Sequence, residues 1–274
     1  MGKPPSGRRG GRSPWRPDSP PRFGRKPGRP GPRSELPGGV AVIYGWHPVT
    51  EALRNGSRTI RRFLATENSA RRLEAEIGAL EPAPEIVRPD EITRLLGPDA
   101  VHQGLYIEAD PLESPELDTL SDDALVLVLD QITDPHNVGA IVRTAAAFGV
   151  EAIVTTARHS PAATGVLAKS ASGGLEHVPF LIVGNLGNAL QTLGERGFLR
   201  VGLDSEGDTD LDAVTVHRPI ALVLGAEGKG LRQRSRETCD VVARLDMPGA
   251  IKSLNVSNAA AVVLYAVTRK LPTP

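Results

Sequence analysis

The chain has 274 residues, 40% hydrophobic but only 4% aromatic, so its core must be built mainly from aliphatic side chains and alanine. No apolar run reaches the roughly 18 residues that a membrane-spanning helix needs, and no apolar signal segment follows the basic N-terminus. Cys239 is the single cysteine, which excludes an internal disulfide and any metal site built from several cysteines. The composition therefore predicts a soluble cytoplasmic protein of one or two domains.

The formal charge of zero conceals a strong asymmetry along the chain. Residues 1–33 hold ten of the 32 Lys and Arg residues but one of the 32 acidic residues, which gives this segment +9 and leaves −9 on the rest. Residues 1–38 are dominated by Pro, Gly, Arg and Ser, a composition that predicts a disordered arm. We expect the arm to bind a polyanion such as RNA through its phosphates. A solvated tail that only improves solubility is the alternative.

Residues 39–110 predict a small α/β unit. Strand-like segments at 41–45, 60–65 and 104–108 alternate with helical patterns. The first expected helix starts near Pro48, because a first helical turn tolerates proline. Two further helices are expected at 70–80 and 91–96. The polar stretch that follows contains two prolines and predicts a linker at 111–122, ahead of a second domain at 123–274.

From residue 124 onward, apolar runs of strand length alternate with helical stretches. The expected strands are 124–129, 152–155, 178–183, 199–203, 220–224 and 241–245, and the expected helices are 138–148, 162–171, 186–195, 231–237 and 256–269. Nearly continuous hydrophobic strands separated by helices indicate a parallel sheet covered on both faces. Because ligands bind beyond the carboxyl ends of such strands, the loops that follow them are the candidate site.

The loop after 124–129 leads into a helix for which Asn137 is the expected N-cap. Arg143 follows six positions later among small and apolar residues, a setting that predicts a buried helix and a guanidinium held in place. A solvent-facing or salt-bridged arginine is the structural alternative. His136, beside Asn137, is at least as well explained as an exposed loop residue.

The loop after 220–224 contains three glycines within six residues, which lets the backbone approach a ligand closely. Its spacing fits neither a phosphate-binding P-loop nor the dinucleotide-binding fingerprint. Glu227 is its most informative residue, because it places a carboxylate where a strand ends.

The loop after 241–245 passes through a Pro-Gly turn into a helix opened by residues that cap helices well. Ser253, Asn255, Ser257 and Asn258 are four such residues within six positions, which is more than a cap requires.

Taken together, the three loops resemble the signature motifs of the SpoU (TrmH-type) branch of the SPOUT RNA 2'-O-ribose methyltransferases. The matching segments are Asn137-x-Gly139-x3-Arg143, Gly225-x-Glu227-x-x-Gly230 and Ser253-Leu-Asn255-Val-Ser257. The upstream unit resembles the L30e-like substrate-binding domain that often precedes this fold. The whole arrangement is most similar to the bacterial large-subunit ribosomal RNA guanosine 2'-O-methyltransferases.

The resemblance implies a homodimer whose catalytic domain ends in a deep trefoil knot. Sequence rules alone predict an ordinary doubly wound sheet, because true knots are nearly absent from proteins. The lack of a Gly-rich loop after 124–129 fits the knotted alternative, since a conventional Rossmann-type methyltransferase would carry one there.

The resemblance also implies S-adenosylmethionine as cofactor and no metal. The catalytic roles that it assigns fall on Arg143, Asn137, Glu227, Ser253 and Asn255. Its cofactor-binding positions correspond to Leu224, Gly225, Ala226, Glu227, Gly228, Leu245, Met247, Ser253, Leu254 and Asn255. Lys229, Arg232 and Lys252 are candidates for contact with RNA phosphates, with ordinary exposed side chains as the alternative.

The central role that the family gives to Arg143 leaves the proton acceptor open. An arginine is a poor general base, because its pKa exceeds about 12. Either its surroundings and a nearby phosphate help it to take the proton, or it orients the ribose and stabilises the developing alkoxide. Glu227 is expected to orient Arg143, a contact that a dimer partner could supply.

The sequence is also compatible with three other functions. The same chemistry could act on transfer RNA, although the front domain disfavours this. The chain could be a non-catalytic RNA-binding or ribosome-assembly factor, but such a protein would be expected to have lost some of the five catalytic positions. An enzyme for a small nucleotide is disfavoured by the basic arm and by the separate front unit.

Overall fold

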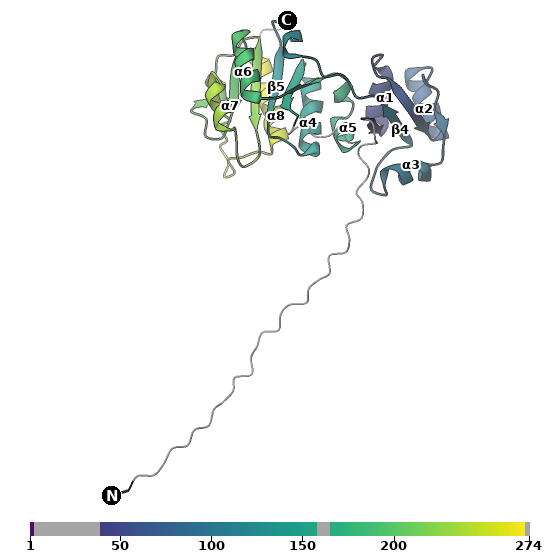
Figure 1. Cartoon of the computed structure of the whole chain (residues 1–274), viewed down its shortest axis with the longest axis horizontal. Helices are drawn as coiled ribbons and strands as arrows, with labels where there is room; N and C mark the ends of the chain where they lie inside the picture. Colours follow the sequence, from purple (N-terminus) through teal and green to yellow (C-terminus); the bar gives the residue numbers. More distant parts are fainter. Residues whose placement is uncertain (3–38, 158–164, 272–274) are drawn as a thin grey trace. The chain divides into compact units, whose positions relative to one another are not determined.

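The computed structural model describes residues 1–2, 39–157 and 165–271 (Figure 1). Residues 3–38 of the expected basic arm and residues 162–164 of the helix expected at 162–171 lie outside the described residues. Within them the chain forms two β-sheets, one of four strands and one of seven. None of the described helices is long and apolar enough to cross a membrane.

The first sheet, which we call the four-stranded unit, has the strand order β1-β4-β2-β3. β4 pairs antiparallel with both β1 and β2, and β3 runs parallel to β2. Its elements are β1 (Ala41–Tyr44), α1 (Trp46–Arg54), β2 (Ile60–Ala65), α2 (Glu67–Ile77), β3 (Glu85–Ile86), α3 (Pro89–Leu96) and β4 (Leu105–Ala109). Separate hydrophobic clusters cover its two faces.

The predicted helices of this unit exist, but their ends differ from the prediction. α2 spans Glu67–Ile77 rather than 70–80, because Gly78 adopts a positive φ of 86° and ends the helix there. α1 begins at Trp46 and carries Pro48 in its first turn, as expected. β3 was not predicted, since two exposed residues give no periodic pattern.

The second sheet, which we call the seven-stranded unit, is entirely parallel and has the order β7-β6-β5-β10-β8-β11-β9. Its strands are β5 (Leu125–Asp130), β6 (Ala152–Thr156), β7 (Phe180–Val183), β8 (Leu199–Leu203), β9 (Thr209–Asp210), β10 (Ile220–Gly225) and β11 (Val241–Arg244). Its α-helices are α4 (Pro135–Ala147), α5 (Gly165–Ala171), α6 (Leu186–Glu195), α7 (Gln233–Thr238) and α8 (Val256–Lys270). The predicted parallel α/β sheet is confirmed, and the two-residue β9 is an addition.

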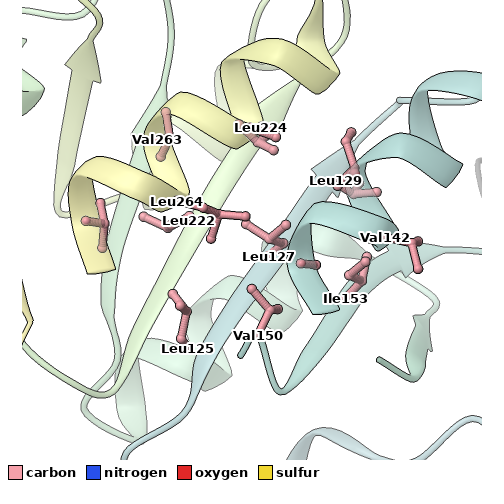
Figure 2. Close-up of a cluster of buried hydrophobic side chains, with 14 of the residues drawn as sticks. Leu125, Leu127, Leu129, Val142, Val150, Ile153, Leu222, Leu224, Val263 and Leu264 are labelled. Carbon is pink, nitrogen blue, oxygen red and sulfur yellow. The ribbon is translucent and has the colours of Figure 1, made fainter. Parts of the chain in front are cut away.

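Alternate residues of the central strands face opposite sides of this sheet, as a parallel sheet buried on both faces requires. Leu127 and Leu222 contribute to the cluster that includes Val142 of α4 and Leu264 of α8, and Figure 2 shows these side chains meeting over β5 and β10. Their neighbours Val128 and Val223 point into a second cluster with residues of α6.

Candidate active site

The three sequence motifs converge at the side of the seven-stranded sheet where the carboxyl ends of its strands lie, which we call the sheet edge. β10 lies between β5 and β8, and the register pairs Gly225 with Asp130 and Leu224 with both Leu129 and Leu203. The carboxyl ends of three parallel strands therefore stop at the same level. The loops that follow them meet there, as the topology of open parallel sheets predicts.

A cavity of about 370 Å³ opens at this edge. Its volume falls in the range of roughly 300–1,000 Å³ that is usual for small-molecule sites. Nine of the ten sequence-predicted cofactor residues line it, namely Leu224, Gly225, Ala226, Glu227, Gly228, Leu245, Met247, Ser253 and Leu254. Asn255 is the exception, because its side chain is hydrogen-bonded beside the cavity.

The glycine-rich loop folds back on itself directly after the carboxyl end of β10. Ala226 and Gly230 form an isolated β-bridge, and Gly230 has a positive φ of 62°. A Cβ atom added at Gly225 would collide with the backbone of Gly230 and Leu231. Glycine at position 225 is therefore required by close backbone packing, and this packing shapes the cavity wall.

A hydrogen-bonded cluster ties the three motifs to one another through Glu227. Its Oε1 accepts from Nδ2 of Asn255 at 2.7 Å, from the backbone N–H of Val256 at 3.1 Å and from Nδ2 of Asn137 at 3.3 Å. Asn255 also donates to Oδ1 of Asn137 at 2.9 Å. One carboxylate thus fixes the first turn of α4 and the start of α8 relative to the cavity.

The start of α4 differs from the prediction. Asp134 is the N-cap, with its side chain accepting from the backbone N–H of His136, and the helix begins at Pro135. Asn137 therefore lies inside the first turn, and its amide is left to bond Glu227 and Asn255. His136 is exposed, as the interpretation as an exposed loop residue expects, but it lies in the first turn of α4 rather than in a loop. At the other end of the cluster, Asn255 does cap α8.

The expectation of a buried, held guanidinium at Arg143 is wrong within this chain. α4 buries Val138, Ile141, Val142 and Ala145, which leaves Arg143 on the exposed face of the helix. Among the described residues Arg143 forms no ion pair, and Glu227 contacts Asn137 and Asn255 instead of it. Small apolar neighbours in the sequence indicated a buried helix but not which of its faces is buried.

Two carboxylates at the same sheet edge were missed by the sequence analysis. Asp130, whose side chain is 0% exposed, accepts from Nε of Arg232 at 2.5 Å and from the Arg232 backbone N–H at 3.2 Å. Asp204 accepts from the backbone N–H of Leu231 at 3.1 Å and lies 3.5 Å from Nη1 of Arg236. Both immediately end or follow a strand, the same signal that singled out Glu227.

The three candidate RNA-contacting side chains are in different situations. Lys229 is exposed and forms no ion pair among the described residues. Arg232 is held by Asp130, and the ammonium of Lys252 donates to the backbone carbonyl of Met247 within its own loop. Of the three, Lys229 is therefore the side chain free to reach a phosphate. The described residues contain no group of three or more His, Cys, Asp or Glu side chains that could hold a metal ion.

Comparison with known families matches both parts of the chain. Residues 124–265 match the SpoU rRNA Methylase family, and residues 42–115 match the family described as RNA 2'-O ribose methyltransferase substrate binding. The two matches cover the seven-stranded and the four-stranded units, respectively.

Similarity to individual proteins extends over most of the chain. A 23S rRNA (guanosine-2'-O-)-methyltransferase of Ralstonia nicotianae is 38% identical over 237 residues, which cover 84% of this chain and 95% of that protein. A protein of the same name from Bordetella pertussis is 35% identical, covering 84% and 97%. The crystal structure of the SpoU methyltransferase AviRb from Streptomyces viridochromogenes in complex with AdoMet aligns with a TM-score of 0.71 at 25% identity, covering 85% of this chain and 90% of that one.

Proposed function

The chain belongs to the SpoU rRNA methylase family, and we propose that it methylates the ribose 2'-hydroxyl of a guanosine in large-subunit ribosomal RNA with S-adenosylmethionine. The observation that carries this proposal is that the second and third motifs line one cavity, while Asn137 of the first motif bonds Glu227 in its wall. The relatives named as 23S rRNA guanosine methyltransferases support the choice of ribosomal over transfer RNA.

The cavity fits the proposed cofactor in its chemistry. Its wall combines apolar side chains such as Leu203, Leu224 and Val263, which suit an adenine ring, with the carboxylates of Asp204 and Glu227, which suit a cationic group. When bound, S-adenosylmethionine supplies an electrophilic methyl group on a sulfonium centre. We propose that the glycine-rich loop and the segment from Leu245 to Leu254 hold it through backbone groups and shape.

We propose that Glu227, Asn137 and Asn255 act as one positioning unit. Glu227 collects three hydrogen bonds on a single oxygen, so it holds Asn137 near the mouth of the cavity and fixes the N-cap of α8. A preorganised arrangement of this kind holds the ribose in line with the methyl group without reorganisation during the reaction. Ser253, which lines the cavity, completes the wall on the side of α8.

Arg143 is the group that we propose to contact the reacting ribose, from a second copy of the chain. Its side chain is exposed and has no ion-pair partner among the described residues, although its helix packs against α8. α8 also exposes Val262 (45%) and Tyr265 (59%), large apolar side chains of the kind that interfaces bury. We propose a homodimer in which these surfaces pair and Arg143 completes the partner's site. There a permanently charged guanidinium would orient the ribose and stabilise the developing alkoxide. The trefoil knot of the C-terminal segment belongs to the same proposal.

The four-stranded unit is proposed to bind the RNA substrate, with Lys229 adding a phosphate contact beside the cavity and Arg232 and Lys252 serving mainly to hold their loops. We place the enzyme in the cytoplasm together with its ribosomal RNA. The boundaries 39–110, 111–122 and 123–274 for the front domain, linker and catalytic domain are retained as predictions.

The test is transfer of labelled methyl from S-adenosylmethionine to purified bacterial ribosomal RNA and transfer RNA. The ribosomal RNA should come from a strain that lacks its own ribose methylases, and nuclease digestion with mass analysis locates the label. We expect a single 2'-O-methylguanosine in large-subunit RNA. Label in transfer RNA alone would indicate that transfer RNA, and not ribosomal RNA, is the substrate. Cofactor binding without transfer to free RNA would indicate an assembly intermediate as substrate, and no cofactor binding would favour a non-catalytic RNA-binding factor.

A further inference from the structure

A short 3₁₀ turn links the four-stranded unit to the helix that carries Arg143. This turn, η2, spans Gly174–Glu176 and follows α5. It contacts α1 of the four-stranded unit on one side and α4 of the seven-stranded unit on the other. No sequence motif marked it, and none of the roles proposed above uses it.

The contact with the four-stranded unit is a buried ion pair. Nη2 of Arg58 donates to Oε1 of Glu176 at 2.5 Å and Nε of Arg58 donates to Oε2 at 3.1 Å, while Nδ2 of Asn55 adds a third bond to Oε2 at 2.8 Å. The side chains of Arg58 and Glu176 are each only 4% exposed. Nη1 of Arg58 also donates to the backbone carbonyl of Asp110, the residue before the predicted linker.

A second contact lies beside this pair, and together the two contacts form what we call the joint between α1 and η2. Nε2 of His177 lies 2.8 Å from Oε2 of Glu51 on α1. Gly173, at a positive φ of 92°, packs so tightly that an added Cβ would lie 2.5 Å from Cγ of Glu51. The turn is therefore seated against α1 with no room for a side chain between them.

The opposite side of the turn packs on the backbone of α4. An added Cβ at Gly174 would lie 3.1 Å from the carbonyl oxygen of Val142 and 3.3 Å from Cα of Arg143. Close-packed interiors have little slack, so a shift of the turn must be accommodated by α4 at the position of Arg143.

A buried ion pair is weak evidence for stability, because desolvation of both charges offsets their attraction. What the pair does supply is orientation, since a guanidinium fork and a carboxylate meet in one plane through two parallel bonds. An apolar contact would hold the two units together without fixing their angle as sharply.

We propose that Arg58, Asn55 and Glu176 are positioning residues for ribose methylation, which hold η2 and thereby place Arg143. The proposal rests on the function proposed above and adds a specific connection between the RNA-binding unit and the reacting group. A misplacement of about 1 Å in a catalytic group can lower a rate by about 100-fold, so a loosened joint is expected to lower kcat.

The first test compares Glu176→Gln and Arg58→Lys with Asp240→Asn. Asp240 pairs with Arg200 through the same two-bond geometry, but within the seven-stranded unit and at the opposite edge of its sheet. We expect both joint variants to lower kcat about 10-fold or more, with unchanged affinity for S-adenosylmethionine. Asp240→Asn should keep the wild-type kcat. Because lysine keeps the charge but lacks the fork, wild-type kcat in Arg58→Lys would overturn the orienting role.

The second test needs no activity. Amide hydrogen exchange of the full chain should become faster at residues 141–144 in Glu176→Gln, with the amides of β5 and β10 unchanged. If Glu176→Gln proves too unstable to purify, Asn55→Ala removes one of the three bonds and should give a smaller change at the same amides. A uniform rise across the sheet, or none in α4, would contradict the coupling. Absence of both S-adenosylmethionine binding and methyl transfer in the wild type would instead contradict the proposed function.

Discussion

Nδ2 of Asn255 donates to Oε1 of Glu227 at 2.7 Å, which joins two loops that lie 28 residues apart in the chain. The same Glu227 oxygen accepts from Asn137, which belongs to the first motif. The resemblance groups these residues as a catalytic set, whereas the structure makes Glu227 the centre of a hydrogen-bonded unit beside the cavity.

Replacement of Glu227 should disturb the site more than the fold. Glu227→Ala removes the acceptor shared by the amides of Asn137 and Asn255 and the N–H of Val256. Because Glu227 and Asn255 are exposed, water can replace that acceptor, and the free energy of unfolding should fall by only about 1 kcal/mol. Calorimetric titration should show at least about 10-fold weaker binding of S-adenosylmethionine. The control is Glu237→Ala, which removes an exposed partner of Gln233 and should bind as the wild type does. Equal affinity in the two variants would contradict the role assigned to Glu227.

Arg143→Ala should abolish turnover without harming the fold. The side chain is exposed, so its removal should change the free energy of unfolding by less than about 0.5 kcal/mol. Loss of a charge that stabilises the transition state should lower kcat by about 100- to 1,000-fold. Single-turnover methyl transfer measures this, and Arg143→Lys should recover only part of the rate because its ammonium lacks the planar fork. Near-normal turnover in Arg143→Ala would remove this residue from the chemistry.

Gly225, which lines the cavity, and Gly249, in the loop after β11, provide a matched test of backbone packing. Gly225→Ala would push a methyl group into the backbone of Gly230 and Leu231, whereas Gly249→Ala meets nothing within 4 Å. Overpacking of this kind costs about 1–3 kcal/mol, and here it should open the loop that lines the cavity. We expect Gly225→Ala to lose cofactor binding in thermal-shift titrations and Gly249→Ala to keep it. A tolerated alanine at position 225 would show that the loop is more adaptable than its packing indicates.

Lys229 and Arg232, three residues apart, should respond differently to alanine. Lys229→Ala should weaken RNA binding and reduce the salt dependence by about one phosphate contact, with stability unchanged. Arg232→Ala should instead lower the free energy of unfolding by about 1–3 kcal/mol, because Asp130 is left buried without its charged partner. Filter-binding measurements over a salt series and urea unfolding report the two effects. The opposite assignment of effects would mean that Arg232 is an RNA contact after all.

Cys239 should be an unreactive thiol in the folded protein. Burial raises the pKa of its side chain to about 12. Its thiolate, the reactive form, should therefore be scarce at pH 8 and should increase as the pH rises. Ellman's reagent should react slowly with native protein and rapidly in urea, and the readout is unambiguous because the chain has one cysteine. Rapid labelling under native conditions would mean that the thiol is accessible and its pKa is not raised.

Local patterns in the sequence predicted the longer helices and strands of both units and the loops of the candidate site, but not the two-residue strands β3 and β9. Buried apolar strands predict a parallel sheet because both of its faces are covered, and ligands bind beyond the carboxyl ends of such strands. That rule located the loops that carry Glu227 and Asn255. Helix ends were predicted less well, since Asp134 rather than Asn137 caps α4 and Gly78 ends α2 earlier than expected.

The partners of each side chain were decided only by the tertiary structure. Arg143 and Asn137 are six residues apart on one helix, yet one faces outward and the other bonds Glu227. The composition of the helix did not indicate which of its faces packs against the sheet. The pairing of Arg58 with Glu176 joins residues that are 118 positions apart. No local pattern contains such a pair, because its energy depends on burial and on the close approach of residues from two different sheets.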